Sequence, residues 1–594
     1  MYRSHTCGEL GKKQVGQKVV LSGWVNNRRD HGGLIFVDLR DRYGLTQIVT
    51  DPEHNTKAHQ VLDSVRPEFV IKVEGMVRAR PEGLGNPKLK TGEIEVILDS
   101  VEVLNESKTP PFEINSDGEV NEELRLKYRY LDLRRDRMKR NVELRHRTIK
   151  FIRDYLDKQN FLEIETPMLI KGTPEGSREY IVPSRLHPGN FYVLPQSPQQ
   201  LKQLSMVAGL DRYFQIARCF RDEDQRGDRQ PEFTQLDLEM SFVDEKDVMD
   251  LNESLMMALC EAMVPGKKML TKPFPRITWQ QAMDDYGSDK PDMRFEMKLA
   301  DATELFRESG FKVFKDAVAN GGVVKMLRVA GGGKFPRSKI DELTDLAKVY
   351  GAHGLAYITA EGGELKSPIL KFLSEKEVAE FKKQSGIQDG DIVFFTADEF
   401  HTAATSLGQV RIACGDFFKL RDPNVFAFLW VIDFPMFEWS KEDNCLTAAH
   451  HPFCSIKIED LPLLQKKPLK ARAKAYDFVL NGVEVGGGSI RIHKPEVQAK
   501  IFEILGISQE DAKNRFGHML EAFTYGAPPH GGIAWGLDRL VMIFCDEPNI
   551  REVIVFPKDQ KARDLMLSAP SELPAAQIAE MHIEVKIPKV KGKV

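Results

Sequence analysis

Alternating apolar and polar residues dominate the chain from Lys18 to about Leu104. Five segments there are rich in β-branched residues and separated by short polar turns, which is typical of β-strands: VVLSGWV, LIFVDLR, LTQIV, FVIKVEGMV and EIEVILDSVEV. Five strands in so short a stretch predict a small closed barrel such as the OB-fold, which binds single-stranded nucleic acid on one face.

The alternation in LIFVDLR assigns its residues to two faces of a strand. One face fills the barrel and consists of Ile35, Val37 and Leu39. The other face points outward and carries Phe36, Asp38 and Arg40. An outward Phe36 close to Arg28 and Arg29 suits the stacking of nucleic-acid bases. The alternative, in which Phe36 packs beneath a neighbouring loop, stays open at this point.

Apolar residues recur at helical spacing after a linker, TPPFEINSDG (109–118). Ile149, Ile152 and Leu156 predict a helix that Asn160 can end before the extended stretch FLEIETPML. Weakly amphipathic helices and glycine-rich turns from about Lys290 to Leu420 indicate an inserted domain. We therefore expect a multidomain α+β protein with an OB barrel (1–107), a linker (108–140), a central domain in two parts (141–288 and 423–562), an α+β insertion (289–422) and a C-terminal extension (563–594) with a loosely held basic end.

Two strand-like runs of the central domain, RYFQIARCFRDED and FTQLDLEMSF, predict an antiparallel hairpin. In the second run an apolar face alternates with a polar face formed by Gln235, Asp237 and Glu239. Arg221 and Glu223 share one face of the first run. An ordered row of polar groups inside a domain favours a ligand site, although an exposed sheet face has the same pattern.

A second hairpin is predicted in AYDFVLNGVEVGGGSIRI, because Asn481-Gly482 is the preferred dipeptide of a two-residue turn. Regular pairing across this turn predicts the pairs Leu480/Val483, Val479/Glu484 and Asp477/Gly486. Asp477 and Glu484 then become diagonal neighbours roughly 7 Å apart. Two carboxylates at that spacing can share a divalent ion, and Mg²⁺ bridging nucleotide phosphates is the obvious candidate.

The glycines after this turn determine how close a ligand can approach the hairpin and whether Arg491 can reach Glu484. Gly486 and Gly488 leave room for a ligand close to the backbone. Strict alternation turns Arg491 to the opposite face, so Arg491 reaches Glu484 only if a β-bulge lies in the glycine triplet. A tight structural hairpin with solvated acids is the alternative.

Near the end of the chain, APPHGGIAWGLDRLVMIF predicts a short strand and a helix whose apolar stripe consists of Leu537, Leu540, Val541 and Phe544. Arg539 lies off this stripe in the first turn, where free backbone N–H groups and the helix dipole favour anions. Arg539 therefore suits triphosphate binding, and an ordinary surface arginine is the alternative.

Composition narrows the class of protein. The 594-residue chain, 42% hydrophobic and 29% charged, can bury large cores, and its longest apolar run (425–432) is too short to span a membrane. It starts without a signal peptide and lacks close cysteine pairs, so we expect a cytoplasmic protein without disulfides. No P-loop or dinucleotide-binding motif occurs.

The formal charge of −4 argues against a surface coated with nucleic acid. Locally, however, ten Lys or Arg against three acids between Arg125 and Arg147 predict a phosphate-binding patch or a solvated helical face.

Together these stretches resemble bacterial-type aspartyl-tRNA synthetases, which are class II ligases, over nearly the whole chain. FLEIETPML is similar to motif 1 of this class, CFRDED with RQPEF to motif 2, and GLDR (536–539) to motif 3. Further stretches resemble this subfamily in particular: KYRYLDLRR, TPEGSREY, LPQSPQQLKQL, DRQPEFTQLD, AHHPF and VEVGGGSIRIH.

The resemblance implies a fold and an activity. The expected parts are an OB barrel that reads the anticodon, an antiparallel catalytic sheet, an insertion domain typical of the bacterial type and a homodimer formed partly through motif 1. The expected reaction uses ATP and Mg²⁺ to activate L-aspartate as aspartyl-adenylate, and then transfers aspartate to the 3′ end of tRNA(Asp).

The resemblance also implies roles for individual residues. Those expected to act in catalysis are Arg221, Glu223 and Arg539. Those expected to bind aspartate are Glu175, Gln199, Lys202, Arg221, Asp237, His450 and Arg491. Those expected to bind ATP, with adenine between Phe233 and Arg539, are Arg221, Asp222, Glu223, Gln230, Phe233, Glu484, Gly536, Leu537, Asp538 and Arg539, while Mg²⁺ is expected on Asp477 and Glu484. Those expected near the anticodon are Arg29, His31, Phe36, Gln47 and Gly83.

His31 and Gly83 resemble the relaxed subtype of these synthetases, which also charges tRNA(Asn) with aspartate. A strictly tRNA(Asp)-specific enzyme, in which His31 caps a turn, is the alternative. More remote alternatives are an ammonia-dependent asparagine synthetase and an inactive tRNA-binding paralogue. An asparaginyl or lysyl synthetase is a closer competitor, but Arg491 and Lys202 favour an acidic substrate.

Overall fold

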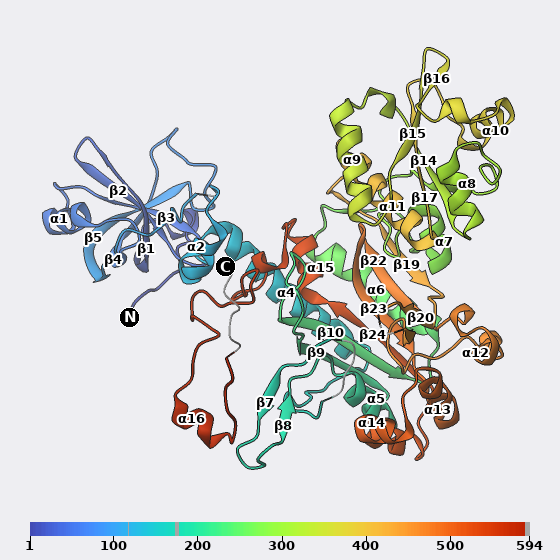
Figure 1. Cartoon of the computed structure of the whole chain (residues 1–594). Coiled ribbons are helices and arrows are strands. Elements are labelled where there is room, and N and C mark those ends of the chain that lie inside the picture. The colour runs from blue at the N-terminus through green and yellow to red at the C-terminus, as the bar shows by residue number, and fades with distance from the viewer. Residues whose placement is uncertain (117, 173–176, 443, 588–594) are drawn as a thin grey trace. The chain divides into compact units, whose positions relative to one another are not determined.

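The computed structural model describes residues 1–116, 118–172, 177–442 and 444–587 and divides the chain into two compact units (Figure 1). The first unit consists of Met1–Glu143 with Arg551–Glu572, and the second of Leu144–Ile550 with Leu573–Val594. Within the described ranges, no helix has both the length and the apolar character of a membrane span.

The N-terminal part of the first unit is a closed five-stranded barrel, as the sequence predicts. Its strands lie in the order β1-β2-β3-β5-β4, with bounds β1 (Lys18–His31), β2 (Leu34–Arg40), β3 (Leu45–Thr50), β4 (Val70–Ala79) and β5 (Ile94–Asn105), and α1 (Thr56–Ser64) follows β3. The alternation predicted for β2 is confirmed, because Ile35, Val37 and Leu39 are almost fully buried in the barrel core. The opposite face of β2 is not simply solvated, since Arg40 is also buried and pairs with Glu68 at 2.7 Å.

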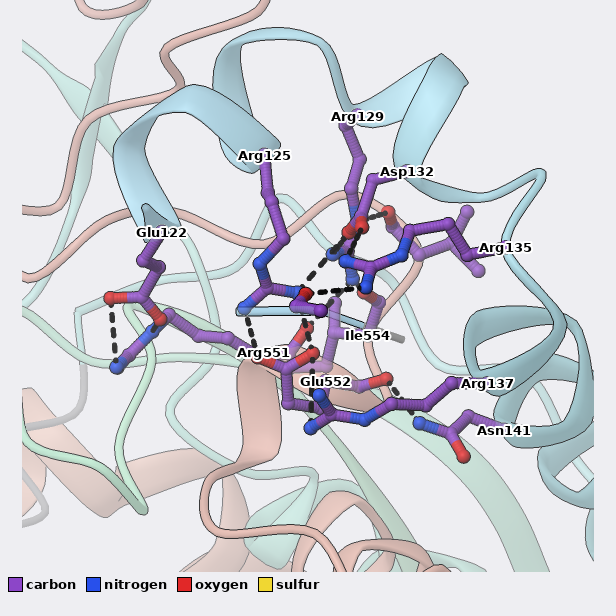
Figure 2. A network of polar contacts seen from close by, with 12 residues as sticks. Glu122, Arg125, Arg129, Asp132, Arg135, Arg137, Asn141, Arg551, Glu552 and Ile554 are labelled. Carbon is purple, nitrogen blue, oxygen red and sulfur yellow. Dashed lines mark hydrogen bonds and ion pairs between the residues drawn. The ribbon is translucent and has the colours of Figure 1, made fainter. Parts of the chain in front are cut away.

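The basic segment after the barrel folds into α2 (Glu122–Lys127), α3 (Arg129–Asp132) and the start of α4 (Asp136–Lys158), and several of its arginines point inward (Figure 2). The Arg125 guanidinium donates to both carboxylate oxygens of Glu552, at 2.9 and 2.6 Å. Arg129 pairs with Asp132 at 2.7 Å and donates to the carbonyl oxygens of Arg551 and Ile554. Neither a phosphate-binding patch nor a solvated face describes these buried arginines, because carboxylates and carbonyls of the same unit already satisfy them.

Glu552 is expected to be essential for the stability of the first unit. Substitution of Glu552 by Gln should lower the free energy of unfolding by about 3–5 kcal/mol, because it removes the closer carboxylate partner of the buried Arg125 and leaves only Asp132, at 3.3 Å. Urea unfolding of the full chain, together with hydrogen exchange of the α2 and α3 amides, measures this loss. The matched control is Glu123→Gln, since the Glu123 side chain is 73% exposed and should matter little.

This contribution should depend on pH. Burial raises the pKa of Glu552, but the hydrogen bond and the charge of Arg125 outweigh burial and lower it overall. A carboxyl group with a lowered folded pKa stabilises the protein above its unfolded pKa, about 4.3, and loses that effect as pH falls. The difference in stability between wild type and Glu552→Gln should therefore shrink below about pH 4, and a difference independent of pH would contradict the assigned ion pair.

The second unit is built on an eight-stranded mixed sheet. The strand order is β12-β19-β22-β23-β24-β10-β9-β6, with bounds β6 (Leu162–Glu163), β9 (Arg212–Phe220), β10 (Glu232–Ser241), β12 (Arg276–Thr278), β19 (Phe428–Ile432), β22 (Ala475–Leu480), β23 (Val483–Ile490) and β24 (His530–Gly536). The strands from β19 to β9 pair antiparallel, as expected, whereas the edge strands β12 and β6 pair parallel to their neighbours. Both predicted hairpins, β9–β10 and β22–β23, lie in this sheet.

Helices and small ribbons accompany the sheet. The helices are α5 (Gln199–Val207), α6 (Glu245–Met263), α7 (Trp279–Tyr286), α12 (Leu463–Lys466), α13 (Pro495–Ile504), α14 (Gln509–Phe523), α15 (Leu537–Phe544) and α16 (Ala575–Glu580). The ribbons are β7 (Ile181–Pro183) with β8 (Phe191–Val193), β11 (Lys268–Met269) with β18 (Val425–Phe426), and β20 (Phe437–Ser440) with β21 (Cys445–Ala448). The apolar stripe predicted for α15 is confirmed, since Leu537, Leu540, Val541 and Phe544 are all buried.

The segment expected to be an insertion forms a sheet of its own with helices around it (Figure 1). Its strand order is β13-β14-β17-β15-β16, with bounds β13 (Leu299–Asp301), β14 (Val323–Val329), β15 (Ala356–Glu361), β16 (Glu364–Lys366) and β17 (Ile392–Asp398). The helices are α8 (Lys312–Ala319), α9 (Arg337–Val349), α10 (Glu375–Ser385) and α11 (Phe400–Phe417). The cluster around Phe306, Phe314 and Phe395 forms one of its apolar cores.

Candidate active site

A cavity of about 590 Å³ is lined by the central strands of the eight-stranded sheet, by α5 and by the start of α15. Strands β10, β22, β23 and β24 contribute side chains or bare glycine backbone to its walls. Gly486, Gly487 and Gly488 on β23 keep the floor free of side chains. The cavity therefore combines open backbone with many charged groups, which suits a polar ligand.

Two cations and two carboxylates form a buried cluster, of which Lys202, Asp237 and Arg491 line the cavity. Lys202 Nζ lies 2.7 Å from Asp237 Oδ1 and 3.3 Å from Glu239 Oε2. Arg491 Nε lies 3.0 Å from Glu239 Oε1, and Arg491 Nη1 lies 2.8 Å from His451 Nε2. Burial lowers the pKa of Arg491, but the charge of Glu239 outweighs it and raises the pKa overall. The arginine is therefore a fixed cation held in one orientation.

The carboxylates of this cluster differ in how completely they are paired. Glu239 bonds to Arg491 through both oxygens, at 3.0 and 3.2 Å, and its pKa is lowered because Arg491 and Lys202 outweigh the effect of burial. Asp237 Oδ2 has no partner among the described residues, and burial raises the pKa of Asp237. An unpaired buried oxygen facing a cavity suits a ligand that brings a hydrogen-bond donor or a positive charge.

The sequence analysis placed Glu239 on a polar face that favours a ligand site but assigned it no role, and it did not name His451. Glu239 lies two positions after Asp237 on β10, so the alternation of this strand already placed both carboxylates on one face. Nothing in the sequence pattern distinguishes His451 from its neighbour His450. His450 lies edge-on to Phe434 with ring centroids 4.7 Å apart, and burial lowers its pKa. His450 lines the cavity, as expected of a residue of this site.

The β22–β23 hairpin turns at Asn481-Gly482 as predicted, with both residues at positive φ. The pairs Leu480/Val483 and Val479/Glu484 are confirmed, but the predicted pair Asp477/Gly486 is wrong, because Asp477 pairs with Gly487. The register shifts between Phe478 and Val479. The bulge required to bring Arg491 to the face of Glu484 therefore exists, one residue before the glycine triplet in which we expected it.

Asp477 and Glu484 lean over the same residue of this hairpin. A side chain built on Gly487 would place its Cβ 2.9 Å from Asp477 Oδ1 and 3.5 Å from Glu484 Oε1. The pKa of Asp477 is raised well above its usual value, first by burial and then by the negative charges of Glu484 and Asp289. Two crowded carboxylates of this kind fit a divalent cation, which would remove their repulsion.

The described residues contain no group of three or more His, Cys, Asp or Glu that could hold a metal ion. A cation on Asp477 and Glu484 would therefore need further ligands from another molecule. Phosphate oxygens and water are the ligands that Mg²⁺ combines with one or two protein carboxylates.

A second group of residues lines the part of the cavity towards α15. The Arg221 guanidinium lies 5.1 Å from the centroid of the Phe233 ring, and Arg221 Nε has no partner among the described residues. Glu223 accepts hydrogen bonds from Ser177 Oγ and, at 3.0 Å, from Arg229 Nη1. Arg539 donates to Glu484 O and Asp228 Oδ2, at 3.1 Å each. Two arginines, an aromatic ring and a carboxylate thus surround one space.

Some of the remaining predicted residues of this site line the cavity, and others do not. Gln199, Gln230 and Gly536 line the cavity. Asp222 lies outside it, 3.9 Å from Arg178, and the Leu537 side chain is buried in the core. Asp538 lies at the cavity wall with both oxygens bonded to protein groups, and the predicted residue Glu175 lies outside the described residues.

The residues expected near the anticodon lie on the barrel. Arg29 on β1 pairs with Asp38 at 2.9 Å and lies opposite Phe36, which is half-buried. Gln47 donates to Glu95 at 2.7 Å. His31 ends β1 and is exposed, and Gly83 lies in the turn between β4 and β5 at a φ of +79°. The barrel therefore presents a polar strip with an aromatic ring, as a surface for unpaired bases requires.

Comparison with known proteins identifies the family. A family model described as tRNA synthetases class II (D, K and N) matches residues 121–560, and one described as OB-fold nucleic acid binding domain matches residues 19–104. The chain belongs to the class II tRNA synthetases. The resemblance inferred from its motifs is confirmed.

This synthetase is similar over nearly its whole length to proteins of Rubrobacter xylanophilus and Geobacillus kaustophilus. It is 53% identical over 99% of its length to Aspartate--tRNA(Asp/Asn) ligase of Rubrobacter xylanophilus, and covers 98% of that protein. It is 51% identical over 99% of its length to Aspartate--tRNA ligase of Geobacillus kaustophilus, and covers all of it (100%). Among solved structures, asparaginyl-tRNA synthetase of Pyrococcus horikoshii complexed with asparaginyl-adenylate has the same fold, with a TM-score of 0.59 at 20% identity over 94% of this synthetase and 98% of that chain.

Proposed function

We propose that this synthetase is an aspartate–tRNA ligase. The observation that carries the proposal is the buried cluster in which Arg491 and Lys202 face a cavity beside Asp237 and Glu239. A small diacid with one ammonium group complements this cluster in charge. The names of the relatives that share about half of its residues, Aspartate--tRNA(Asp/Asn) ligase and Aspartate--tRNA ligase, support the same substrate.

Aspartate binding follows from the pairing in the cluster. Arg491 presents a planar guanidinium, which Glu239, His451 and Ser489 hold in place, and it binds the side-chain carboxylate of aspartate. Lys202 adds a second positive charge on the same side. The free oxygen of Asp237 accepts a hydrogen bond from the substrate ammonium. Asparagine would leave Arg491 facing an amide, which discriminates between the two amino acids.

ATP binds in the part of the cavity that Arg221, Phe233 and Arg539 line. Its adenine lies between Phe233 and Arg539, and Arg221 reaches the α-phosphate, where an unpaired Nε is available. Glu223 and Gln230 orient the nucleotide. Asp477 and Glu484 would hold Mg²⁺, which would neutralise charge on the phosphates.

The reaction has two steps. In the first, an oxygen of the aspartate α-carboxylate attacks the α-phosphorus, the bond to the β-phosphate oxygen breaks, and pyrophosphate leaves. In the second, the 3′-hydroxyl of the terminal adenosine of tRNA attacks the acyl carbon, and AMP leaves. Arg221 stabilises the charge that develops on the α-phosphate, and the rest of the site positions the reactants. No covalent intermediate with the protein is required.

The barrel is the part of the chain that contacts the tRNA anticodon. The barrel strip around Arg29, Phe36 and Gln47 binds the anticodon bases. By its resemblance to this family we propose that the enzyme acts in the cytoplasm as a homodimer, with FLEIETPML at the dimer contact.

The enzyme should charge tRNA(Asn) as well as tRNA(Asp), since His31 is an exposed polar residue and Gly83 is small. Side-by-side aminoacylation of the two purified tRNAs with aspartate and ATP tests the activity and its breadth. We expect His31→Leu to lower charging of tRNA(Asn) about tenfold, as loss of one good base contact does, and to leave tRNA(Asp) nearly unchanged. The matched control is His54→Leu on the same barrel. Charging of tRNA(Asp) alone by the wild type would contradict the broad specificity and leave the ligase assignment intact.

A further inference from the structure

Asp538 sits in the first turn of α15, directly before Arg539, but its carboxylate is used entirely by other parts of the protein. Asp538 Oδ1 accepts a hydrogen bond from Arg145 Nη1 at 2.5 Å, and Asp538 Oδ2 accepts one from the backbone N–H of Thr234 at 2.8 Å. Its side chain is 4% exposed. Both oxygens of this buried carboxylate are bonded to protein groups, which points to a role in holding the site together.

Arg145 completes a three-way connection. Its Nη2 donates to Thr234 Oγ1 at 3.1 Å. One guanidinium therefore bonds both to Asp538 on α15 and to Thr234 on β10. Arg145 belongs to the part of α4 that lies in the second unit, as Thr234 and Asp538 do. The group formed by Arg145, Thr234 and Asp538 is called the α4 clamp below.

The clamp lies where the backbone pairing between β10 and β24 ends. The last pair between β10 and β24 is Gln235 with Gly536, and beyond it β24 gives way to α15. The amide of Thr234 therefore has no strand partner on that side, and the Asp538 carboxylate takes the place of one. The spacing between the end of β10 and the first turn of α15 thus depends on this carboxylate and on the cation that neutralises it.

The residues next to the clamp are those that contact the nucleotide in the proposed function. Phe233 precedes Thr234 and lines the cavity under Arg221. Arg539 follows Asp538 and lines the same cavity. The clamp therefore sets the distance between the two groups that enclose adenine.

We propose that Arg145 is a positioning residue for ATP, acting through Asp538 and Thr234 on the Phe233–Arg539 pair. Without Arg145, Asp538 would be a buried carboxylate lacking its cation, and the adjacent Arg539 would be drawn towards it and away from the triphosphate. This inference rests on the proposed function, because it assigns the clamp to the ATP side of that reaction. Aspartate is proposed to bind at the Lys202–Arg491 cluster, which shares no residue with the clamp, so its affinity should not depend on the clamp.

The test is ATP–pyrophosphate exchange by the full-length enzyme carrying Arg145→Met, which keeps side-chain length and removes the charge. We expect KM for ATP to rise roughly 10- to 100-fold, as misplacement of about 1 Å does, while KM for aspartate stays within about twofold. Arg145→Lys should recover part of the loss. The matched control is Arg147→Met, an exposed arginine on the same helix, which should behave as wild type.

Asp538→Asn combined with Arg145→Met provides a second measurement. Because the double variant no longer buries an unpaired charge, its KM for ATP should be no higher than that of Arg145→Met alone. Calorimetric titration with Mg²⁺–ATP gives the same comparison for any variant too slow for exchange. If Arg145→Met does not fold, Arg145→Lys and the double variant carry the comparison.

The outcomes separate this inference from the proposed function. A KM for ATP unchanged in Arg145→Met, or KM values that rise equally for ATP and aspartate, would overturn the positioning role. A wild-type protein without aspartate-dependent exchange would overturn the proposed function itself, and ATP affinity measured by calorimetry would still decide whether Arg145 positions the nucleotide.

Discussion

Replacement of Arg491 by alanine should lower kcat/KM for aspartate in ATP–pyrophosphate exchange by about 10³-fold or more. Arg491 is 2% exposed and lies within hydrogen-bond distance of Glu239, His451 and Ser489, so no water can take its place without rearrangement. Its loss leaves Glu239 with Lys202 as its remaining cation and removes the guanidinium proposed to bind the substrate side-chain carboxylate. Loss of a buried cation that serves both carboxylates explains why the expected loss exceeds that of an ordinary contact.

The controls separate recognition from folding. Arg491→Lys keeps the charge but loses the planar fork, and should recover only part of the activity. Arg185→Ala removes an exposed arginine of the same unit and should have no effect. Mg²⁺–ATP affinity, measured by calorimetry, should stay unchanged in Arg491→Ala. A wild-type KM for aspartate in that variant would show that another residue binds the side-chain carboxylate.

The barrel and the two hairpins were predictable because local patterns determine them. Alternation fixes which side chains of β2 enter the core, and Asn481-Gly482 fixes the turn of β22–β23. The position of the bulge was not predictable to the residue, because one extra residue in a ladder leaves no separate mark in the sequence. That single residue decides whether Arg491 faces Glu484, so the main uncertainty of the site lay in one register shift.

Pairing of charges was harder to predict than their presence. The ten cations between Arg125 and Arg147 were evident, but the partner of Arg125 is Glu552, which lies 427 positions away. Likewise, Arg145 pairs with Asp538 across 393 positions. A basic cluster in a sequence therefore indicates neither a solvated face nor a phosphate site until the acids that the fold brings to it are known.

The same limit applied inside the cavity. The resemblance named Lys202 and Arg491 as ligands of aspartate without showing that Glu239 lies between them. Glu239 makes the cluster neutral overall before substrate binds. Aspartate therefore binds among paired opposite charges, and the empty site carries no excess positive charge. Discrimination in such an array depends on geometry more than on net attraction.

Removal of one carboxylate at the proposed metal position should have opposite effects on activity and on stability. Asp477→Asn should lower the rate of aspartate-dependent exchange by about 10²- to 10³-fold at low Mg²⁺, because one of two protein ligands of the ion is lost. The same substitution should raise the melting temperature of the metal-free protein. Asp477 is buried next to Glu484, and its raised pKa means that its ionised form is disfavoured in the folded state.

The direction in which stability changes with pH follows from the raised pKa of Asp477. An acid whose folded pKa is raised binds its proton more tightly when folded, so the wild-type protein loses stability as pH rises above the unfolded pKa of about 3.9. The melting temperature of Asp477→Asn should exceed that of wild type more at pH 8 than at pH 5, and Mg²⁺ with ATP should close the gap by stabilising only the wild type. Asp546→Asn, which removes an exposed carboxylate of the same unit, serves as the matched control. An Asp477→Asn protein that is less stable than wild type without metal would mean that Asp477 is held by a partner in the protein and is not poised for a cation.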